Sequence, residues 1–246
     1  MNKGKTDPAL DHWANGLEKF AESYGVSTLT RDPSAVGIGK LIRKIDMLAE
    51  QEIGRIHELT AIAVANGQAA PFACQKGCAH CCYQMVATTI PEVLVIADSL
   101  RASLSDEELN GVMDRLQIYS DANADVPLDK KLGRVAKCPL LVDEVCSIFE
   151  VRPLACRGFN SSDVEACKEF KKAPGTVRIP HSIAQSLAAS KLRDGIQDSL
   201  EKVGLGHLLF EFAEALLIAL RIPDAADRYL VGERLFDGAA CAGQPI

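Results

Sequence analysis

The segment "ACQKGCAHCC", residues 73–82, constrains the fold of this chain more than any other feature. It places Cys74, Cys78, Cys81 and Cys82 within nine residues. Such crowding has three explanations: a disulfide framework, a set of buried apolar cysteines, or thiolates that bind a metal. The remainder of the sequence decides between them.

The other cysteines favour the metal. The 246-residue chain has nine cysteines, of which Cys138, Cys146, Cys156 and Cys167 follow in its middle while Cys241 stands apart near its end. Residues 1–20 contain lysines but no apolar signal segment, so we expect a cytoplasmic protein. A reducing compartment keeps disulfides open. Scattered core cysteines would not gather in one third of the chain, which leaves metal ligation as the preferred explanation.

The charge and the hydropathy pattern argue against two classes of partner. The 27 basic residues are outnumbered by 33 acidic residues, which gives a net charge of −6, so we expect no nucleic-acid partner. The most apolar segment, residues 207–220, is interrupted by Glu211 and Glu214 and is shorter than the roughly 20 residues of a membrane-spanning helix. We therefore expect a core helix there and no membrane partner.

The flanking regions have the pattern of helices. Apolar residues recur at three- and four-residue spacing from Val36 to Asn66, and again beyond Pro180. Pairs typical of helix starts occur at Thr89 with Glu92, Ser105 with Glu108 and Ser162 with Glu165. Two short apolar runs on either side of Asp143 and Glu144 predict a small β-hairpin.

These patterns predict a mainly α fold, a helical single domain (1–246) around an irregular cysteine-rich centre with a small β-hairpin. We expect residues 70–170 to form the metal-binding core and residues 1–69 and 171–246 to supply flanking helices.

Eight central cysteines can fill one metal site or two, because such sites usually need four soft ligands. Cys81 and Cys82 are adjacent, and consecutive side chains tend to diverge. We therefore predict that they serve different sites, with Cys74, Cys78 and Cys81 in one and Cys82 with the downstream cysteines in the other, or that one of the pair is a reactive or buried thiol. The CxxxCxxC spacing also occurs in radical S-adenosylmethionine enzymes, but the chain has too few strands for their β/α barrel.

The full pattern resembles a known family. "CQKGCAHCC" followed by "CPLLVDEVCSIFEVRPLACRGF" is similar to the YkgJ-type cysteine-cluster family, also described as the CxxCxxCC zinc- or iron-chelating domain, across residues 70–170. The resemblance implies metal binding, with an iron-sulfur cluster (4Fe-4S) or zinc as cofactor. The candidate ligands are Cys74, Cys78, Cys81, Cys82, Cys138, Cys146, Cys156 and Cys167. Packing with Val164 and Phe170 on one helical face explains Cys167 equally well.

The biochemical role stays open at this point. One branch of the family resembles iron-sulfur-dependent flagellin lysine N-methylases, but this chain has no Gly-rich strand-turn-helix for a methyl donor. The alternatives are an enzyme, a redox or metal-handling protein with a protein partner, and a structural zinc module in a protein interaction. Arg152 and Arg157 flank Cys156 and either compensate thiolate charge or form ordinary salt bridges. No catalytic residue can be assigned. His80 lies between candidate ligands and could replace a cysteine at zinc, although a role beside the ligands or in solvent is more common for a loop histidine. The other histidines, His12, His57, His181 and His207, show no ligand pattern.

Overall fold

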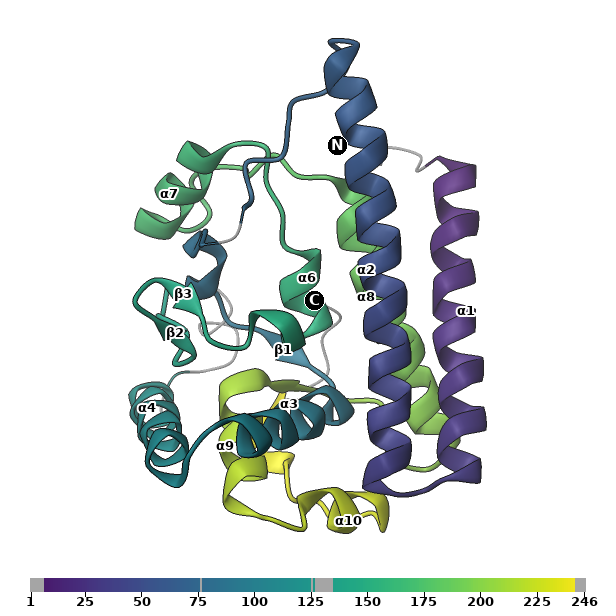
Figure 1. The fold of residues 1–246 in the computed structure, drawn as a ribbon, viewed down its shortest axis with the longest axis vertical. Helices are drawn as coiled ribbons and strands as arrows, with labels where there is room; N and C mark the ends of the chain where they lie inside the picture. The colour runs from purple at the N-terminus through teal and green to yellow at the C-terminus, as the bar shows by residue number, and fades with distance from the viewer. Residues whose placement is uncertain (1–6, 76, 125, 127–134, 242–246) are drawn as a thin grey trace.

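Three long helices, α1, α2 and α8, lie side by side along one edge of the molecule, and the cysteine-bearing loops lie on the opposite side (Figure 1). The computed structural model describes residues 7–75, 77–124, 126 and 135–241. Its α-helices are α1 (Pro8–Arg31), α2 (Ala35–Ala65), α3 (Ile90–Ser103), α4 (Asp106–Asn123), α6 (Leu154–Gly158), α7 (Val164–Lys172), α8 (Ile183–Lys202), α9 (Phe212–Arg221) and α10 (Ala225–Leu230). The 3-10 helices are η1 (His80–Tyr83), η2 (Phe149–Val151) and η3 (Asp237–Ala239).

The predicted helix from Val36 to Asn66 is confirmed as α2. Ser34 caps its first turn, because the Ser34 hydroxyl accepts a hydrogen bond from the backbone N–H of Gly37. Gly67 follows the last turn with φ of +70°, a left-handed conformation that glycine adopts without strain. The capping boxes at Thr89 and Ser105 likewise open α3 and α4.

Helices α1 and α8 approach so closely that a glycine is required between them. A Cβ atom at Gly195 of α8 would lie 2.3 Å from the backbone oxygen of Glu18 and 2.7 Å from the Cβ of Ala21, both in α1. By contrast, a Cβ at Gly54 of α2 would meet no atom within 4 Å. Both positions are glycines inside helices, and only the packing distinguishes them.

We expect Gly195→Ala to lower the free energy of unfolding by about 2 kcal/mol, because overpacking costs about 1–3 kcal/mol and outweighs the better helix propensity of alanine. Gly54→Ala is the matched control and should raise stability by about 0.5–1 kcal/mol, since only the propensity changes there. Urea unfolding of both variants measures the difference. Equal effects of the two substitutions would contradict the close packing of α1 on α8.

A small three-stranded sheet joins the segment after the cysteine block to the C-terminal region. Its strands are β1 (Ala87–Thr88), β4 (Leu209–Glu211) and β5 (Ala240–Cys241), in the order β1-β4-β5 with antiparallel pairing. The prediction of one continuous core helix over residues 207–220 is therefore wrong at its start. Glu211 caps α9 by accepting from the N–H of Glu214, and the three residues up to Glu211 pair with strands instead.

The predicted hairpin is confirmed between β2 (Leu141–Val142) and β3 (Val145–Cys146). Asp143 and Glu144 both have positive φ, as a two-residue type I′ turn requires. The start of α7 differs by one residue from the prediction, because Asp163, in place of Ser162, accepts from the first free N–H groups of the helix.

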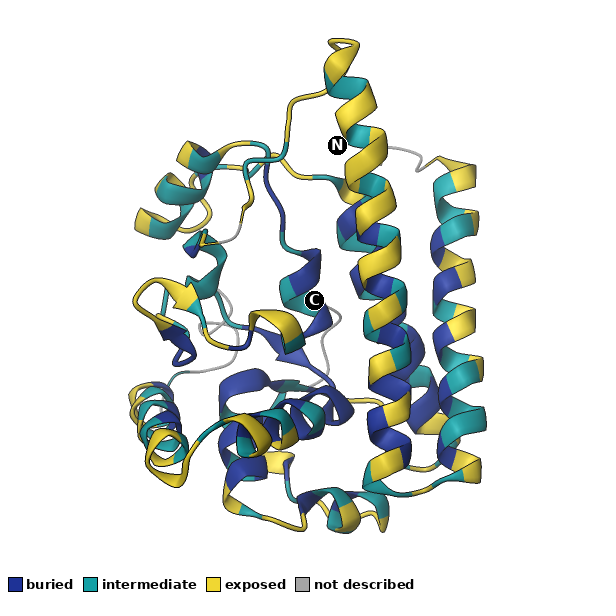
Figure 2. Cartoon of the chain, in the orientation of Figure 1, coloured by how far each residue is buried: buried dark blue, intermediate teal, exposed yellow. Residues whose placement is uncertain are grey.

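Figure 2 shows that α9, β1 and much of α6 are buried, so the main core lies between the long helices and the cysteine-rich side. The mainly α fold class is confirmed. None of the helices in the described ranges is both long and apolar enough to cross a lipid bilayer.

Candidate metal centre

Four cysteines converge from four separate segments, and we call them the inner group: Cys81 of η1, Cys138 of the loop before β2, Cys146 of β3 and Cys156 of α6. Backbone hydrogen bonds hold the segments together. The N–H of Cys138 donates to the carbonyl oxygen of Cys82 at 2.8 Å, which ties the loop to η1. Cys146 lies opposite Leu141 in the hairpin. Residues up to 75 apart are thereby brought to one place.

Burial and electrostatic repulsion act together on the thiols of the inner group. A hydrogen bond with Cys82, followed by burial, raises the pKa of Cys81. Burial is the main cause for the other three: it raises the pKa of Cys138 to about 11 and also raises the pKa of Cys146 and Cys156. In each of the six pairs that these four thiols form, the charge of one thiolate raises the pKa of the other. The four thiols thus lie in one place, as the ligands of a common metal ion or cluster would.

Backbone N–H groups already point at some of these sulfurs. The backbone N–H of Leu140 hydrogen-bonds to the thiol of Cys138, and the backbone N–H of Ile148 to the thiol of Cys146. Each hydrogen bond lowers the pKa of its thiol and so offsets part of the increase caused by burial. Hydrogen bonds of this kind to sulfur are typical of thiolates bound to metal or to iron-sulfur clusters. The local backbone therefore favours the charged form that ligation needs.

Two buried carboxylates increase the negative charge around the inner group. Glu92 of α3 is 3% exposed and Glu211 of β4 is 4% exposed; the first raises the pKa of Cys156 and the second that of Cys138. Arg152 supplies positive charge, because it lowers the pKa of Cys81 and Cys146. Four thiolates beside two carboxylates need further cationic charge. The donor set therefore fits a bound metal ion or cluster.

A second set of thiols lies beside the first, and we call it the outer group: Cys74, Cys78 and Cys167. Burial raises the pKa of Cys74, and the charges of Cys78, Cys81 and Cys167 raise it further. The backbone N–H of Ser161 hydrogen-bonds to the Cys74 sulfur at 3.2 Å. Cys167 thus faces other thiols, and plain burial beside Val164 and Phe170 does not describe its whole environment.

The grouping differs from the predicted partition. Cys81, in place of Cys82, lies with the downstream cysteines of the inner group, and Cys82 contacts it through a hydrogen bond between the two side chains. Divergence of adjacent side chains predicts that the pair separates, but sequence spacing does not say which member turns inward. In Figure 1 the segment that follows α2 runs past α7, which carries Cys167, before it reaches the hairpin.

The distances between sulfurs bear on the kind of metal. All nine cysteines lie in the described ranges and none forms a disulfide. Within those ranges no three cysteine sulfurs lie within 4.8 Å of one another. A tetrahedral zinc ion with Zn–S distances of about 2.3 Å holds its sulfurs about 3.8 Å apart. An iron-sulfur cluster binds each thiolate at a different iron atom, so its ligands are farther apart.

Arg157 fixes the helix that carries Cys156. Its side chain is only 2% exposed, donates to the carbonyl oxygens of Arg152 and Glu150, and forms ion pairs with Asp46 and Glu50 of α2. Of the two roles predicted for the flanking arginines, Arg157 therefore forms salt bridges. Arg152 combines both roles, since it also pairs with Glu50 at 3.5 Å.

The buried pair of Asp46 and Arg157 has a pH-dependent consequence. Burial raises the pKa of Asp46 to about 6, although Arg157 Nη2 lies 3.4 Å from Asp46 Oδ2 and opposes the change. The same carboxyl titrates near 3.9 in the unfolded chain, so the folded state binds its proton more tightly. Its contribution to stability is fully present below about pH 4 and is lost as the pH rises through about 6.

We therefore expect the stability of the wild-type protein, relative to Asp46→Asn, to fall by up to about 3 kcal/mol between about pH 4 and pH 7. Urea unfolding of both proteins at intervals across this range gives the difference directly. A difference that stays constant with pH would show that Asp46 titrates normally in the folded protein.

Comparison with known proteins is informative for the middle of the chain alone. Residues 73–186 match the model of the CxxCxxCC family, described as a putative zinc- or iron-chelating domain. This segment belongs to the CxxCxxCC family. The CxxCxxCC domain contains both the inner and the outer group, while Cys241 lies outside it. No curated protein and no solved structure matches the chain.

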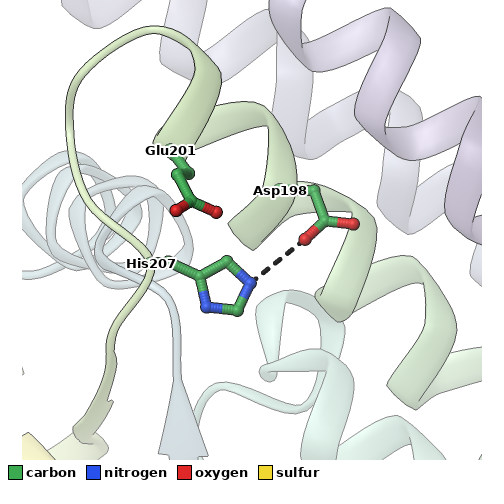
Figure 3. Close-up of side chains that lie close together, drawn as sticks. All are labelled: Asp198, Glu201 and His207. Carbon is green, nitrogen blue, oxygen red and sulfur yellow. Dashed lines mark hydrogen bonds and ion pairs between the residues drawn. The ribbon is translucent and has the colours of Figure 1, made fainter.

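A separate cluster of possible metal ligands lies outside the CxxCxxCC domain. Figure 3 shows His207, in the loop before β4, facing Asp198 and Glu201 near the end of α8. The three donor atoms lie within 4.8 Å of one another, and His207 Nε2 is 3.1 Å from Asp198 Oδ1. No spacing pattern in the sequence connects His207 to these carboxylates. The contact holds the loop to the helix, and the three side chains are half-buried or exposed.

Sequence reasoning also missed the role of the two buried carboxylates. In the sequence Glu92 is part of a capping box, and Glu211 interrupts an apolar segment. A charged residue inside an apolar run is itself a signal, because its burial has to be compensated. That signal could have drawn attention to Glu211, whereas nothing local connects Glu92 to Cys156.

Proposed function

We propose that the chain binds an iron-sulfur cluster through the inner group, Cys81, Cys138, Cys146 and Cys156. The observation that carries this proposal is the convergence of four thiols from four segments, with the charges of Cys81, Cys138 and Cys146 all raising the pKa of Cys156. Such an arrangement is unfavourable for an empty set of thiolates and favourable once a cation is bound.

The spacing of the sulfurs supports a cluster over a single zinc ion. A zinc site would bring at least three sulfurs within about 4 Å of one another, and the described residues contain no such trio of cysteines. Buried donors at Leu140 and Ile148, together with Arg152, supply the hydrogen bonds and charge that tune clusters. Zinc at the inner group is the alternative.

The outer group supports a second metal position formed by Cys74, Cys78 and Cys167, with Cys81 of the inner group as the further thiol whose charge acts on Cys74. Three ligands with a less defined fourth leave room for an exchangeable ligand. We also propose a cytoplasmic location, because a reducing compartment keeps these thiols available to the metal.

Anaerobic purification followed by metal and sulfide analysis tests the proposal. We expect a brown protein with about four iron and four acid-labile sulfide for each cluster bound. A colourless protein with stoichiometric zinc and no sulfide would replace the cluster by zinc. A protein that retains neither metal after anaerobic reconstitution would contradict metal binding by the cysteines.

A further inference from the structure

A small cavity lies between α6, α8 and the residues that lead into β1. In Figure 1, α6 lies between β1 and α8, and the cavity is formed where the three segments meet. Its volume is about 190 Å³. Its walls include Met85 and Ala87 beside β1, Ala155 and Phe159 at α6, and a face of α8, but none of the cysteines. The cavity is therefore distinct from the metal centre.

The wall formed by α8 combines small residues with one charge. Ser186, Ala189, Ser190 and Arg193 occupy positions i, i+3, i+4 and i+7 and so lie on one face of the helix. The hydroxyl of Ser190 donates to the carbonyl oxygen of Leu187 in its own helix. Small side chains leave space on this face, and Arg193 is the charged residue of the lining.

Arg193 has donors that the protein does not use. Its side chain is 11% exposed, and its Nε is the one buried side-chain nitrogen or oxygen in the described ranges without a hydrogen-bond partner. Nη2 lies 3.4 Å from Asp194 Oδ1, a long contact, and Lys191 approaches the same carboxylate at 3.5 Å. A buried donor without an acceptor is costly. The cavity is thus lined by a guanidinium whose buried Nε has no acceptor.

We propose that this cavity binds a small monocarboxylate with an apolar body. A carboxylate matches the planar guanidinium of Arg193 and accepts from its unused N–H groups. The apolar part of the ligand would contact Met85, Ala155 and Phe159. A dry apolar cavity of about 150 Å³ accepts benzene, so this cavity has room for a body of that size. The proposal does not depend on the metal that the cysteines bind.

Benzoate and benzamide are suitable probes, because they have nearly the same shape and differ in charge. Binding of each to the full-length protein, as purified with its metal, can be followed by calorimetry and by ligand-detected NMR. We expect saturable binding of benzoate and binding of benzamide weaker by about tenfold or more, since hydrogen bonds to charged groups are worth about 1.5–3 kcal/mol. Equal affinity for the two probes, or no saturable binding of benzoate, would overturn the proposal.

Three variants locate the site. Ser190→Leu fills the cavity from α8 and should abolish benzoate binding, while Arg193→Gln should weaken it by about tenfold or more. Arg234→Gln is the matched control, because Arg234 is 81% exposed and pairs with Asp237 far along the chain; it should leave the affinity unchanged. Undiminished binding to a folded Ser190→Leu protein would refute the assignment even if Arg193→Gln failed to fold.

Discussion

Cys156→Ser should remove the metal of the inner group and leave the outer group able to bind. Cys156 interacts with all three other thiols of the inner group, so its loss opens that centre to solvent and removes one of four ligands. The charges that raise the pKa of Cys156 include those of Cys138, Cys81 and Cys146, whereas those acting on Cys74 include those of Cys78 and Cys167. Metal and sulfide analysis of the anaerobically reconstituted variant, beside the wild-type protein, measures the loss.

The same substitution should lower stability strongly. Metal binding contributes to folding wherever the ligands come together only in the folded state, and structural zinc sites contribute about 10–16 kcal/mol of apparent binding free energy. Whole domains are stable by only about 5–15 kcal/mol. We therefore expect Cys156→Ser to lose several kcal/mol, with the hairpin and α6 becoming sensitive to proteolysis before the long helices do.

Two further cysteine variants make the result specific. Cys74→Ser should affect mainly the outer group, because Cys74 lies beside Cys78 and Cys167 and hydrogen-bonds with Ser161. Cys241→Ser changes a buried cysteine of β5 outside the CxxCxxCC domain and should retain the full metal content. If Cys156→Ser kept all its metal, or Cys241→Ser lost as much, the inner group could not be the metal centre.

The helices of this protein follow from local sequence. The apolar spacing from Val36 to Asn66 and the capping pair at Ser105 each depend on residues within a few turns of one another, and both elements form where predicted. The strand at Leu209–Glu211 does not follow in this way. It forms because Ala87 and Thr88, more than 120 residues earlier, supply its partner. A pairing over that distance leaves no local pattern.

In the candidate site, too, some features follow from local sequence and others depend on distant segments. The spacing of Cys74, Cys78, Cys81 and Cys82 is local, and together with the downstream cysteine motif it is enough to indicate the CxxCxxCC family. Which thiols share a centre depends on how the hairpin and α6 fold back onto η1, and this places Cys81 beside the downstream cysteines, where the prediction has Cys82. The candidate ligands are therefore accessible from the sequence, whereas their grouping is not.

Glu92→Ala should be the most damaging substitution outside the cysteines. Glu92 Oε2 accepts hydrogen bonds from the hydroxyls of Thr88 and Thr89 at 2.9 and 2.8 Å and from the Thr89 N–H at 3.0 Å. Its other oxygen, Oε1, accepts from the N–H of Leu154 at 2.8 Å, the first residue of the helix that carries Cys156. One buried carboxylate thus joins the start of α3 to the start of α6.

Truncation at Glu92 leaves several buried donors without an acceptor, each at a cost of about 1–3 kcal/mol, so we expect a loss of about 4 kcal/mol in the free energy of unfolding. Thr88→Val is the matched control, because it removes a donor together with its hydrogen bond and should cost only about 1 kcal/mol. Urea unfolding of the two metal-loaded variants and of the wild-type protein measures these free energies.

The effect of Glu92→Ala on metal retention has two opposing contributions. The charge of Glu92 raises the pKa of Cys156, so its removal favours the thiolate; the loss of the Leu154 hydrogen bond frees the helix that positions the same thiol. The loss of metal affinity from a misplaced sulfur outweighs the gain from a slightly lower thiol pKa, because coordination requires the sulfur to lie within a few tenths of an ångström of its ideal distance from the metal. Glu92→Ala should therefore release metal to a chelator faster than the wild-type protein. Slower release would show that charge, and not position, is what Glu92 contributes to the metal centre.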